Sequence, residues 1–171
     1  QHLRRLNDIA FSGDGEPTTF RNFDEIIEQA ARGRSLHAAA EVRMVLITNA
    51  SMFHRPHVQR GLSILDSNNG QIWAKLDAGT EDYYKLIERT KIPFRQILDN
   101  IRDAAKLRPI VIQSLFMNVN DVPPDDHEIA EFAKRLGEVV AAGGKIELVQ
   151  IYTVARQPAE SFVTALTENQ L

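Results

Sequence analysis

Five short apolar runs, separated by amphipathic helical patterns, constrain the fold of this chain more than any other feature of its sequence. Val, Ile and Leu dominate most of them, as is typical of parallel strands that are buried on both faces. The runs cover Asp8–Ser12, Val42–Asn49, Gln71–Leu76, Pro109–Phe116 and Lys145–Val154. They start roughly 30 to 38 residues apart, which leaves room for one crossover helix between successive strands.

The intervening segments carry apolar residues at helical spacing, which predicts a helix after each of the first four strands. The last of these helices is preceded by Pro123-Pro124, and Asp125 with Glu128 forms a capping-box pattern at its start. A further short helix is predicted over 81–89. The expected apolar stripes are Phe23, Ile26, Ile27, Ala30 and Ala31; Val58, Leu62 and Leu65; Phe94, Ile97, Leu98, Ile101 and Ala105; and Ile129, Phe132, Ala133, Leu136 and Val140.

This alternation predicts an α/β domain with a parallel sheet and right-handed crossovers, spanning residues 1–171 as a single unit. The number of units suits an open doubly wound sheet or part of a (β/α) barrel. A complete eightfold barrel needs about 250 residues, whereas most of a six-unit partial barrel fits. The chain starts at Gln1 and its last residues are equally abrupt, so we expect a fragment truncated at both ends.

Composition narrows the functional classes only modestly. A net charge of −3 gives no global attraction to nucleic acid or to an anionic membrane. No apolar run approaches the roughly 18 residues of a membrane span, and no signal peptide is visible, so we expect a cytoplasmic protein. The sequence has no cysteine, which excludes disulfides and thiolate metal sites within these residues, and we assign no metal ligand.

Polar residues cluster where each predicted strand ends, and ligands of parallel α/β proteins bind at those ends. The clearest cluster is the glycine-rich acidic loop after the first run, which Pro17 closes. The candidate residues are Ser12, Gly13, Asp14, Gly15 and Glu16; Thr48, Asn49 and Ser51; Lys75 and Asp77; Gln113, Ser114 and Asn118; and Gln150, Tyr152, Thr153 and Arg156.

Structural explanations compete with the functional one at several of these positions. Gly13 and Gly15 could simply permit a tight turn. Lys75 and Asp77 lie two residues apart on one face of a strand, so they could form an ion pair that seals the interior. Gln150 and Tyr152 could be a hydrogen-bonded core pair. The concentration of such residues on one predicted edge of the sheet is what favours a binding site.

Three of these strand ends carry motifs in an order that resembles one enzyme superfamily. They are Ser-Gly-Asp-Gly-Glu-Pro-Thr at 12–18, Ile-Thr-Asn-Ala-Ser at 47–51 and Lys-Leu-Asp-Ala-Gly at 75–79. The run Val-Gln-Ile-Tyr-Thr-Val-Ala-Arg at 149–156 adds to the pattern. Together they resemble radical S-adenosylmethionine (SAM) proteins of the wyosine-synthase-like and activase-like group, over nearly the whole chain.

The resemblance implies a partial (β/α)₆ TIM-like barrel and a SAM-binding portion of an Fe–S oxidoreductase. Members of this superfamily hold a [4Fe–4S] cluster on three cysteines in the loop after the first barrel strand. That loop would lie upstream of Gln1, so the intact parent would cleave SAM reductively to a 5′-deoxyadenosyl radical. The chain as given lacks the cluster ligands, and we expect it to be inactive alone.

The resemblance also implies roles for the polar strand ends, although it assigns no catalytic residue. Residues 12–16 would meet the amino-acid part of SAM, with the Gly15 backbone and the Glu16 carboxylate receiving its ammonium. Thr48 and Asn49 would contact SAM or substrate, and Lys75 and Asp77 would lie near the ribose or carboxylate. Gln113, Gln150 and Tyr152 would line the side toward adenine or substrate, and Arg156 would meet an anionic substrate group.

Two other functions remain open from the residues alone. A lysine in an apolar interior has a lowered pKa and can attack carbonyls, so Lys75 could be the Schiff-base nucleophile of an aldolase-like barrel. Residues 12–18 could instead cradle a phosphate in a binding module, although no lysine follows the glycines and two carboxylates repel anions. Transfer RNA is suggested as a partner only by the resemblance, and the net charge of −3 does not support it.

Overall fold

A computed structural model describes residues 6–13, 15–37 and 41–170. The elements, in chain order, are β1 (Asp8–Phe11), the 3₁₀ turn η1 (Pro17–Thr19), α1 (Phe23–Leu36), β2 (Arg43–Thr48), α2 (Pro56–Asp66), β3 (Gly70–Lys75), α3 (Glu81–Glu88), α4 (Phe94–Leu107), β4 (Ile110–Leu115), β5 (Met117–Val119), α5 (Asp126–Ala141), β6 (Ile146–Tyr152) and β7 (Val163–Ala165). Strands and helices alternate through most of the chain, so the predicted α/β class is confirmed.

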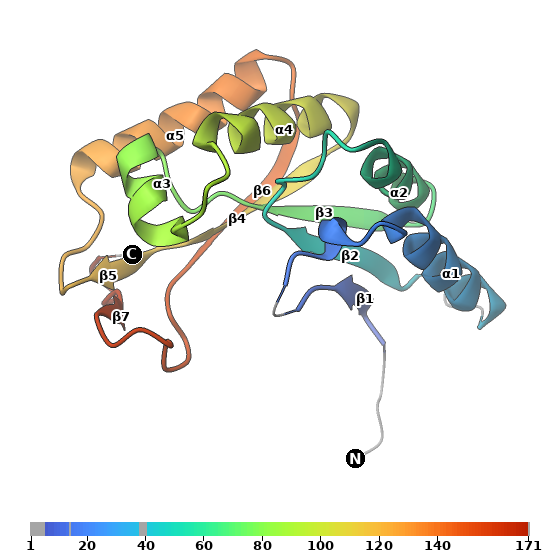
Figure 1. Cartoon of the computed structure of the whole chain (residues 1–171), viewed down its shortest axis with the longest axis horizontal. Helices are drawn as coiled ribbons and strands as arrows, with labels where there is room; N and C mark the ends of the chain where they lie inside the picture. The colour runs from blue at the N-terminus through green and yellow to red at the C-terminus, as the bar shows by residue number, and fades with distance from the viewer. Residues whose placement is uncertain (1–5, 14, 38–40, 171) are drawn as a thin grey trace.

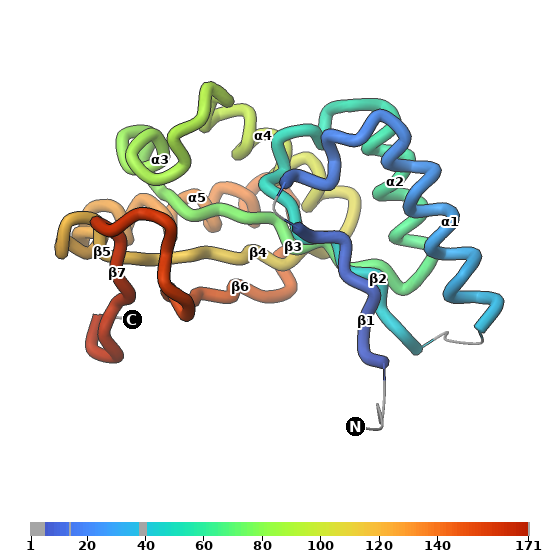
Figure 2. Tube along the Cα trace, turned by 60° about the horizontal axis from the view of Figure 1, so that its bottom comes forward, coloured from blue at the N-terminus to red at the C-terminus, as the bar shows by residue number. Residues whose placement is uncertain are grey.

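The main sheet has five parallel strands in the order β1-β2-β3-β4-β6, so each strand lies beside its predecessor in the chain. Crossovers of one hand then place all the helices on the same side of the sheet, and Figures 1 and 2 show them there. A doubly wound sheet would carry helices on both sides. Among the described residues β1 and β6 are the edge strands and do not pair with each other, so the structure shows no closed barrel.

All five predicted strands of this sheet form within two residues of their expected bounds. The residues of β3 show why the apolar runs in the sequence predicted the strands. Ile72 and Ala74 point into the core beneath the helices and are almost fully buried, whereas Trp73 and Lys75 face the opposite side. Cross-strand register then places Lys75 beside Gln113, and Gln113 beside Gln150, on the side without helices.

The predicted helices also form, but two of their apolar stripes were partly wrong. Ile26 on α1 is 38% exposed, and Ile129 and Val140 on α5 are 40% and 58% exposed. The buried face of α5 is instead centred on Phe132 and Val139. Because α5 covers β4 and β6 at one edge of the sheet, its outer flank meets no neighbouring helix in the described part of the chain.

The sequence pattern missed a small second sheet, in which β5 and β7 pair antiparallel. Each strand has only three residues, and their pairing joins segments more than 40 residues apart. Asn118 stabilises the pairing of β5 with β7, because its side-chain amide donates to the Ala165 carbonyl at 2.9 Å and to Thr164 Oγ1 at 3.3 Å. Asn118 therefore supports the chain beyond β6, and not the expected site.

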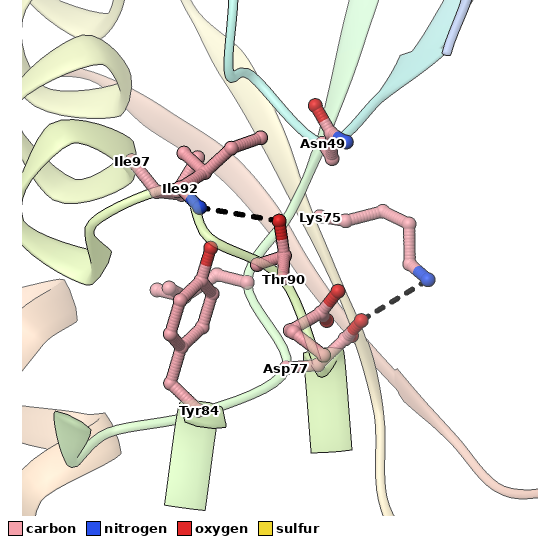
Figure 3. A pocket seen from close by; sticks show the side chains of 9 residues that line it. Asn49, Lys75, Asp77, Tyr84, Thr90, Ile92 and Ile97 are labelled. Carbon is pink, nitrogen blue, oxygen red and sulfur yellow. Dashed lines mark hydrogen bonds and ion pairs between the residues drawn. The ribbon is translucent and has the colours of Figure 1, made fainter. Parts of the chain in front are cut away.

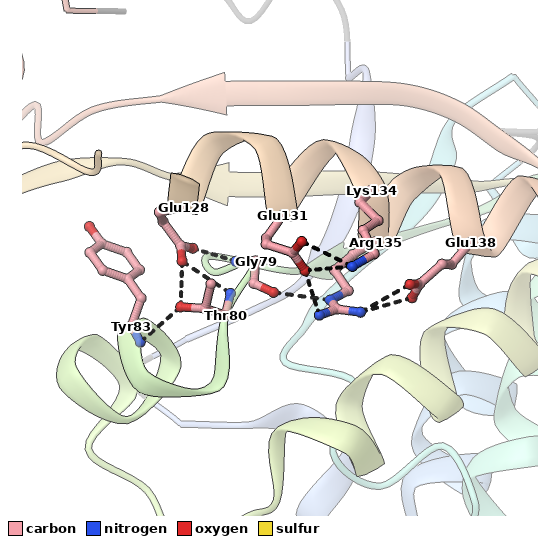
Figure 4. Close-up of polar contacts among 8 residues, drawn as sticks. All are labelled: Gly79, Thr80, Tyr83, Glu128, Glu131, Lys134, Arg135 and Glu138. Carbon is pink, nitrogen blue, oxygen red and sulfur yellow. Dashed lines mark hydrogen bonds and ion pairs between the residues drawn. The ribbon is translucent and has the colours of Figure 1, made fainter. Parts of the chain in front are cut away.

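Glu128 on α5 connects that helix to the start of α3 (Figure 4). Its carboxylate accepts hydrogen bonds from the Gly79 amide, from the Thr80 amide at 3.0 Å and from Thr80 Oγ1 at 2.6 Å. Only half of the predicted capping box is present: Asp125 Oδ1 accepts from the Glu128 amide at 2.8 Å, but the Glu128 side chain turns away from the helix start. Arg135 Nε adds a bond to the Gly79 carbonyl at 3.0 Å.

Candidate functional site

The glycine-rich loop after β1 is tied to the end of β2 through Glu16. Glu16 Oε1 accepts from the Thr18 amide at 3.0 Å, from Thr18 Oγ1 at 2.6 Å and from Thr48 Oγ1 at 2.6 Å. Glu16 Oε2 accepts from the Asn49 amide at 2.7 Å. These bonds bring the first two predicted clusters together at the carboxyl edge of the sheet, and they leave Oε2 with capacity for a further donor.

The rest of this loop is exposed. Ser12, Gly13 and Gly15 are open to solvent, and Asp14 lies outside the described residues. Neither described glycine has a positive φ, and a Cβ at either position would meet no atom within 4 Å. The predicted alternative that these glycines serve a tight turn therefore has no steric support, and the loop surface is bare enough for a ligand to approach the backbone.

Lys75 and Asp77 form the expected ion pair, with Lys75 Nζ 3.0 Å from Asp77 Oδ2. Asp77 is 5% exposed, and its other oxygen accepts from the Leu115 amide at 2.7 Å, which joins the ends of β3 and β4. Burial lowers the pKa of the Lys75 amine, but the charges of Asp77 and other nearby groups outweigh it, so the pKa lies above its ordinary value. The amine is therefore a cation at neutral pH.

Glu88, in the last turn of α3, is a member of this cluster that sequence reasoning missed. Its carboxyl lines the same cavity as Asp77, near enough for the two charges to affect each other. Burial, followed by the negative charge of Asp77, raises the pKa of Glu88 to about 7, although the charge of Lys75 opposes this. A glutamate near the end of a short surface helix carries no sequence signal for such a role, because the contact depends on how the loop after β3 folds.

These side chains line one cavity of about 170 Å³ at the carboxyl edge of the sheet (Figure 3). Charged and polar groups lie on one side of it and apolar side chains on the other. The Tyr84 ring is fixed by stacking on Phe94, with ring centres 4.8 Å apart. The lining residues are Asn49, Lys75, Leu76, Asp77, Tyr84, Glu88, Thr90, Ile92 and Ile97.

Three further predicted residues lie on β4 and β6, on the side of the sheet without helices, and among the described residues they do not line the cavity. Gln113 Nε2 donates to Gln150 Oε1 at 3.1 Å, so these two side chains form a pair between β4 and β6. Tyr152, two residues after Gln150, is close enough to Lys75 for its charge to affect the lysine. Burial raises the pKa of the Tyr152 hydroxyl, so this group is neutral at physiological pH.

The structure thus brings together part of the predicted site. Asn49, Lys75 and Asp77 share one cavity, and Glu16 reaches it through the Asn49 backbone. Arg156 is exposed in the segment after β6, and among the described residues it is not part of the cavity lining. Ser114 is buried and donates to the Leu76 carbonyl at 2.7 Å, so its hydroxyl is used within the sheet.

Two further observations concern metals and membranes. Within 6–13, 15–37 and 41–170, no group of three or more His, Cys, Asp or Glu side chains is arranged to hold a metal ion. No helix in these ranges has both the length and the apolar character needed to cross a bilayer.

Comparison with known proteins gives little about function. No family model matches the chain. A curated protein named GTPase Obg, from Brachyspira hyodysenteriae (strain ATCC 49526 / WA1), is 21% identical over 173 aligned residues. The alignment covers 98% of this chain but 23% of that protein, so the chain spans about a quarter of its length.

Proposed function

We propose that the carboxyl edge of the sheet binds SAM, and that the chain is the SAM-binding portion of a partial (β/α)₆ barrel of the radical SAM type. The observation that carries this proposal is the Glu16 connection, which holds the glycine-rich loop against the end of β2, beside Asn49 and the Lys75–Asp77 pair. The order of the strands supports it, because a wall of parallel strands with helices on one side is the arrangement of a barrel segment.

The residues at this edge suit the groups of SAM. SAM carries an ammonium, a carboxylate, a sulfonium and a ribose diol. Glu16 Oε2 and the exposed backbone of Ser12, Gly13 and Gly15 offer acceptors to the ammonium. Lys75, whose side chain is 33% exposed, offers a cation to the carboxylate. Gln113 and Gln150 offer amide groups to the adenine or ribose. SAM would lie along the edge, since a cavity of about 170 Å³ is close to the volume that holds a single benzene.

The residues present do not suit an iron–sulfur cluster. The superfamily binds its cluster through three thiolates, and the 171 residues contain no cysteine. When SAM is bound beside a cluster it supplies a 5′-deoxyadenosyl radical, but we derive no such step for this chain. The part that these residues would perform is to bind and orient SAM and to exclude water from it.

Calorimetric titration of the chain with SAM tests the proposal directly. We expect saturable binding that weakens at least tenfold in Glu16→Gln and in Lys75→Met. Lys85→Gln is the matched control, because Lys85 is an exposed lysine that pairs with Glu81 on the outer face of α3. The proposal is wrong if the chain does not bind SAM, or if Lys75→Met and Lys85→Gln bind it equally well.

The structure weakens the Schiff-base alternative. That alternative assumes a Lys75 pKa below the ordinary value, and the ion pair with Asp77 raises it instead, so the amine is a poor nucleophile at neutral pH. Borohydride reduction in the presence of a small keto acid should therefore leave Lys75 unmodified.

A second alternative comes from the name of the similar protein. GTPases of the P-loop class cradle phosphates with Gly-x₄-Gly-Lys-Ser/Thr, and this motif does not occur in the 171 residues. The glycine-rich loop at 12–16 carries Glu16 in place of the lysine, so it favours a cationic group over a phosphate. We therefore do not extend GTP hydrolysis to this chain.

A further inference from the structure

We propose that the cavity between α3 and the end of β3 binds a small aliphatic amine, with its ammonium group held by Asp77 and Glu88. The occupant is a ligand distinct from SAM, which is too large for the cavity. The inference does not depend on SAM binding, and it concerns Glu88, which the proposed function does not use.

The charged side chains around the cavity indicate that it would take a cationic ligand. Among the described residues that line it, two carboxyl groups, Asp77 and Glu88, lie beside one cation, Lys75. Each Asp77 oxygen already has one partner, Lys75 Nζ at 3.0 Å and the Leu115 amide at 2.7 Å, and each has capacity for a second donor. Without a further cation in the cavity, repulsion between the two carboxylates is relieved when Glu88 takes up a proton. An ammonium group has three donors and a positive charge, so it can replace that proton.

The shape and the opposite wall indicate the rest of the ligand. Ile92 and Ile97 face the charged groups across the cavity, and the stacked Tyr84 ring closes one side of it (Figure 3). A volume of about 170 Å³ admits a chain of roughly four carbons and one nitrogen. Its carbon atoms would contact isoleucine side chains while the nitrogen contacts Glu88, which is the arrangement expected for a primary alkylamine.

Glu88 makes this recognition depend on pH. The titratable groups that face it are Lys75 from β3, Asp77 from the following loop, Tyr84 from α3 and Tyr152 from β6. The pKa of Lys75 and that of Tyr152 lie above their ordinary values, and the pKa of Tyr84 is raised to about 12, so none of these three groups changes charge between pH 6 and 9.

The direction of the dependence follows from the charge of the free carboxyl group. With a pKa of about 7, Glu88 is neutral below that pH and competes with the ligand through its own proton. We expect the affinity for an amine to rise as the pH increases from 6 to 8, by close to tenfold per unit below pH 7, and to level off above it. Binding at pH 6 should release nearly one proton.

Titration of the ¹⁵N-labelled chain with n-butylamine, followed by NMR, tests the inference without SAM. The shifts should be largest at the Thr90 and Ile92 amides, and n-butanol, which has the same shape without the charge, should bind at least tenfold more weakly. Sodium chloride at matched concentration controls for ionic strength. Equal binding of butanol and butylamine, or shifts scattered over other surfaces, would overturn the proposal.

Two variants separate the role of Glu88 from a general charge effect. Glu88→Gln keeps a hydrogen-bonding group beside Asp77, and it should weaken butylamine binding about tenfold at pH 8 and abolish the pH dependence. Glu81→Gln removes an exposed charge from the same helix and should change neither. Calorimetry in two buffers of different ionisation enthalpy measures the released proton. If butylamine binding to Glu88→Gln still depends on pH, the proposal is wrong. An NMR spectrum showing that Glu88→Gln is folded would establish that any weakened binding is due to the lost carboxylate and not to unfolding.

Discussion

At the scale of single residues, Glu88 should leave a signature in the stability of the free protein. A carboxyl group whose pKa is raised from 4.5 to about 7 by folding stabilises the folded state most at low pH, and this contribution is lost as the pH rises through 7. After a discount for partial solvent exposure, we expect the unfolding free energy of the wild type to fall, relative to Glu88→Gln, by about 1–2 kcal/mol between pH 5 and 8. Urea titrations of both proteins measure it, and parallel pH profiles would contradict the shift.

Gly15 offers a second test at this scale, because its role in binding can be separated from its role in folding. A Cβ at this position would meet no atom within 4 Å, and φ is not positive, so Gly15→Ala should change the unfolding free energy by less than about 0.5 kcal/mol. If a ligand approaches the loop backbone closely, the added methyl should weaken SAM binding about tenfold or more. A variant that binds SAM like the wild type would mean that the ligand does not approach this face of the loop.

At the scale of elements, the β3–α3 loop packs closely against α5 at Gly79. A Cβ on Gly79 would lie 2.0 Å from the Phe132 amide nitrogen, which belongs to the backbone and cannot rotate away. Gly79→Ala should therefore cost more than about 2 kcal/mol of unfolding free energy. Because this loop also carries Asp77 and leads to α3, the same substitution should weaken ligand binding in the cavity.

Gly137 on the exposed face of α5 is the matched control. A Cβ there meets no atom within 4 Å, so Gly137→Ala gains helix propensity and should stabilise the protein by about 0.5–1 kcal/mol. Chemical unfolding of the two alanine variants under the same conditions gives both values. Opposite signs are expected, and a tolerated Gly79→Ala would show that α5 can move away from the loop.

Elements marked by local sequence patterns could be predicted, whereas contacts between distant segments could not. The strands of the main sheet were predictable because their buried positions, such as Ile72 and Ala74, form continuous apolar runs. The cap at Asp125 was predictable because it is local, whereas the path of the Glu128 side chain depends on a loop 49 residues away. The pairing of β5 with β7 was missed for the same reason: three-residue strands carry little pattern, and their partners are distant in the chain.

The same distinction between local sequence signals and long-range contacts applies to the candidate site. The residues at strand ends were predicted, because parallel strands place their carboxyl ends at one edge, and Asn49, Lys75 and Asp77 do share a cavity. Glu88 could not be predicted, because its place beside Asp77 in the cavity follows from the packing of α3 and not from spacing in the sequence. The Schiff-base alternative assumed a lowered pKa for Lys75, whereas the ion pair with Asp77, which the sequence spacing also suggested, raises that pKa.

At the scale of the whole molecule, a single apolar core joins the helices at both ends of the sheet. It includes Phe23 and Ile27 from α1 together with Ile101 from α4 and Val139 from α5. The chain has one tryptophan, Trp73 on β3 in the middle of the sheet. We therefore expect the fluorescence of Trp73 and the helical circular dichroism to report the same urea midpoint, as in a two-state transition. Midpoints that differ would divide the core into two parts.

The placement of every crossover helix on one side of the sheet has a consequence for how the chain can vary. Along β3, the side chains that meet the helices must fill a packed layer, whereas Gln71 and Trp73 point to the side of the sheet without helices. A saturation library over this strand should accept many amino acids at codons 71 and 73 and only a few at codons 72 and 74. The positions of β3 that face the helices therefore maintain the fold, while positions on the opposite side of the strand can change their chemistry.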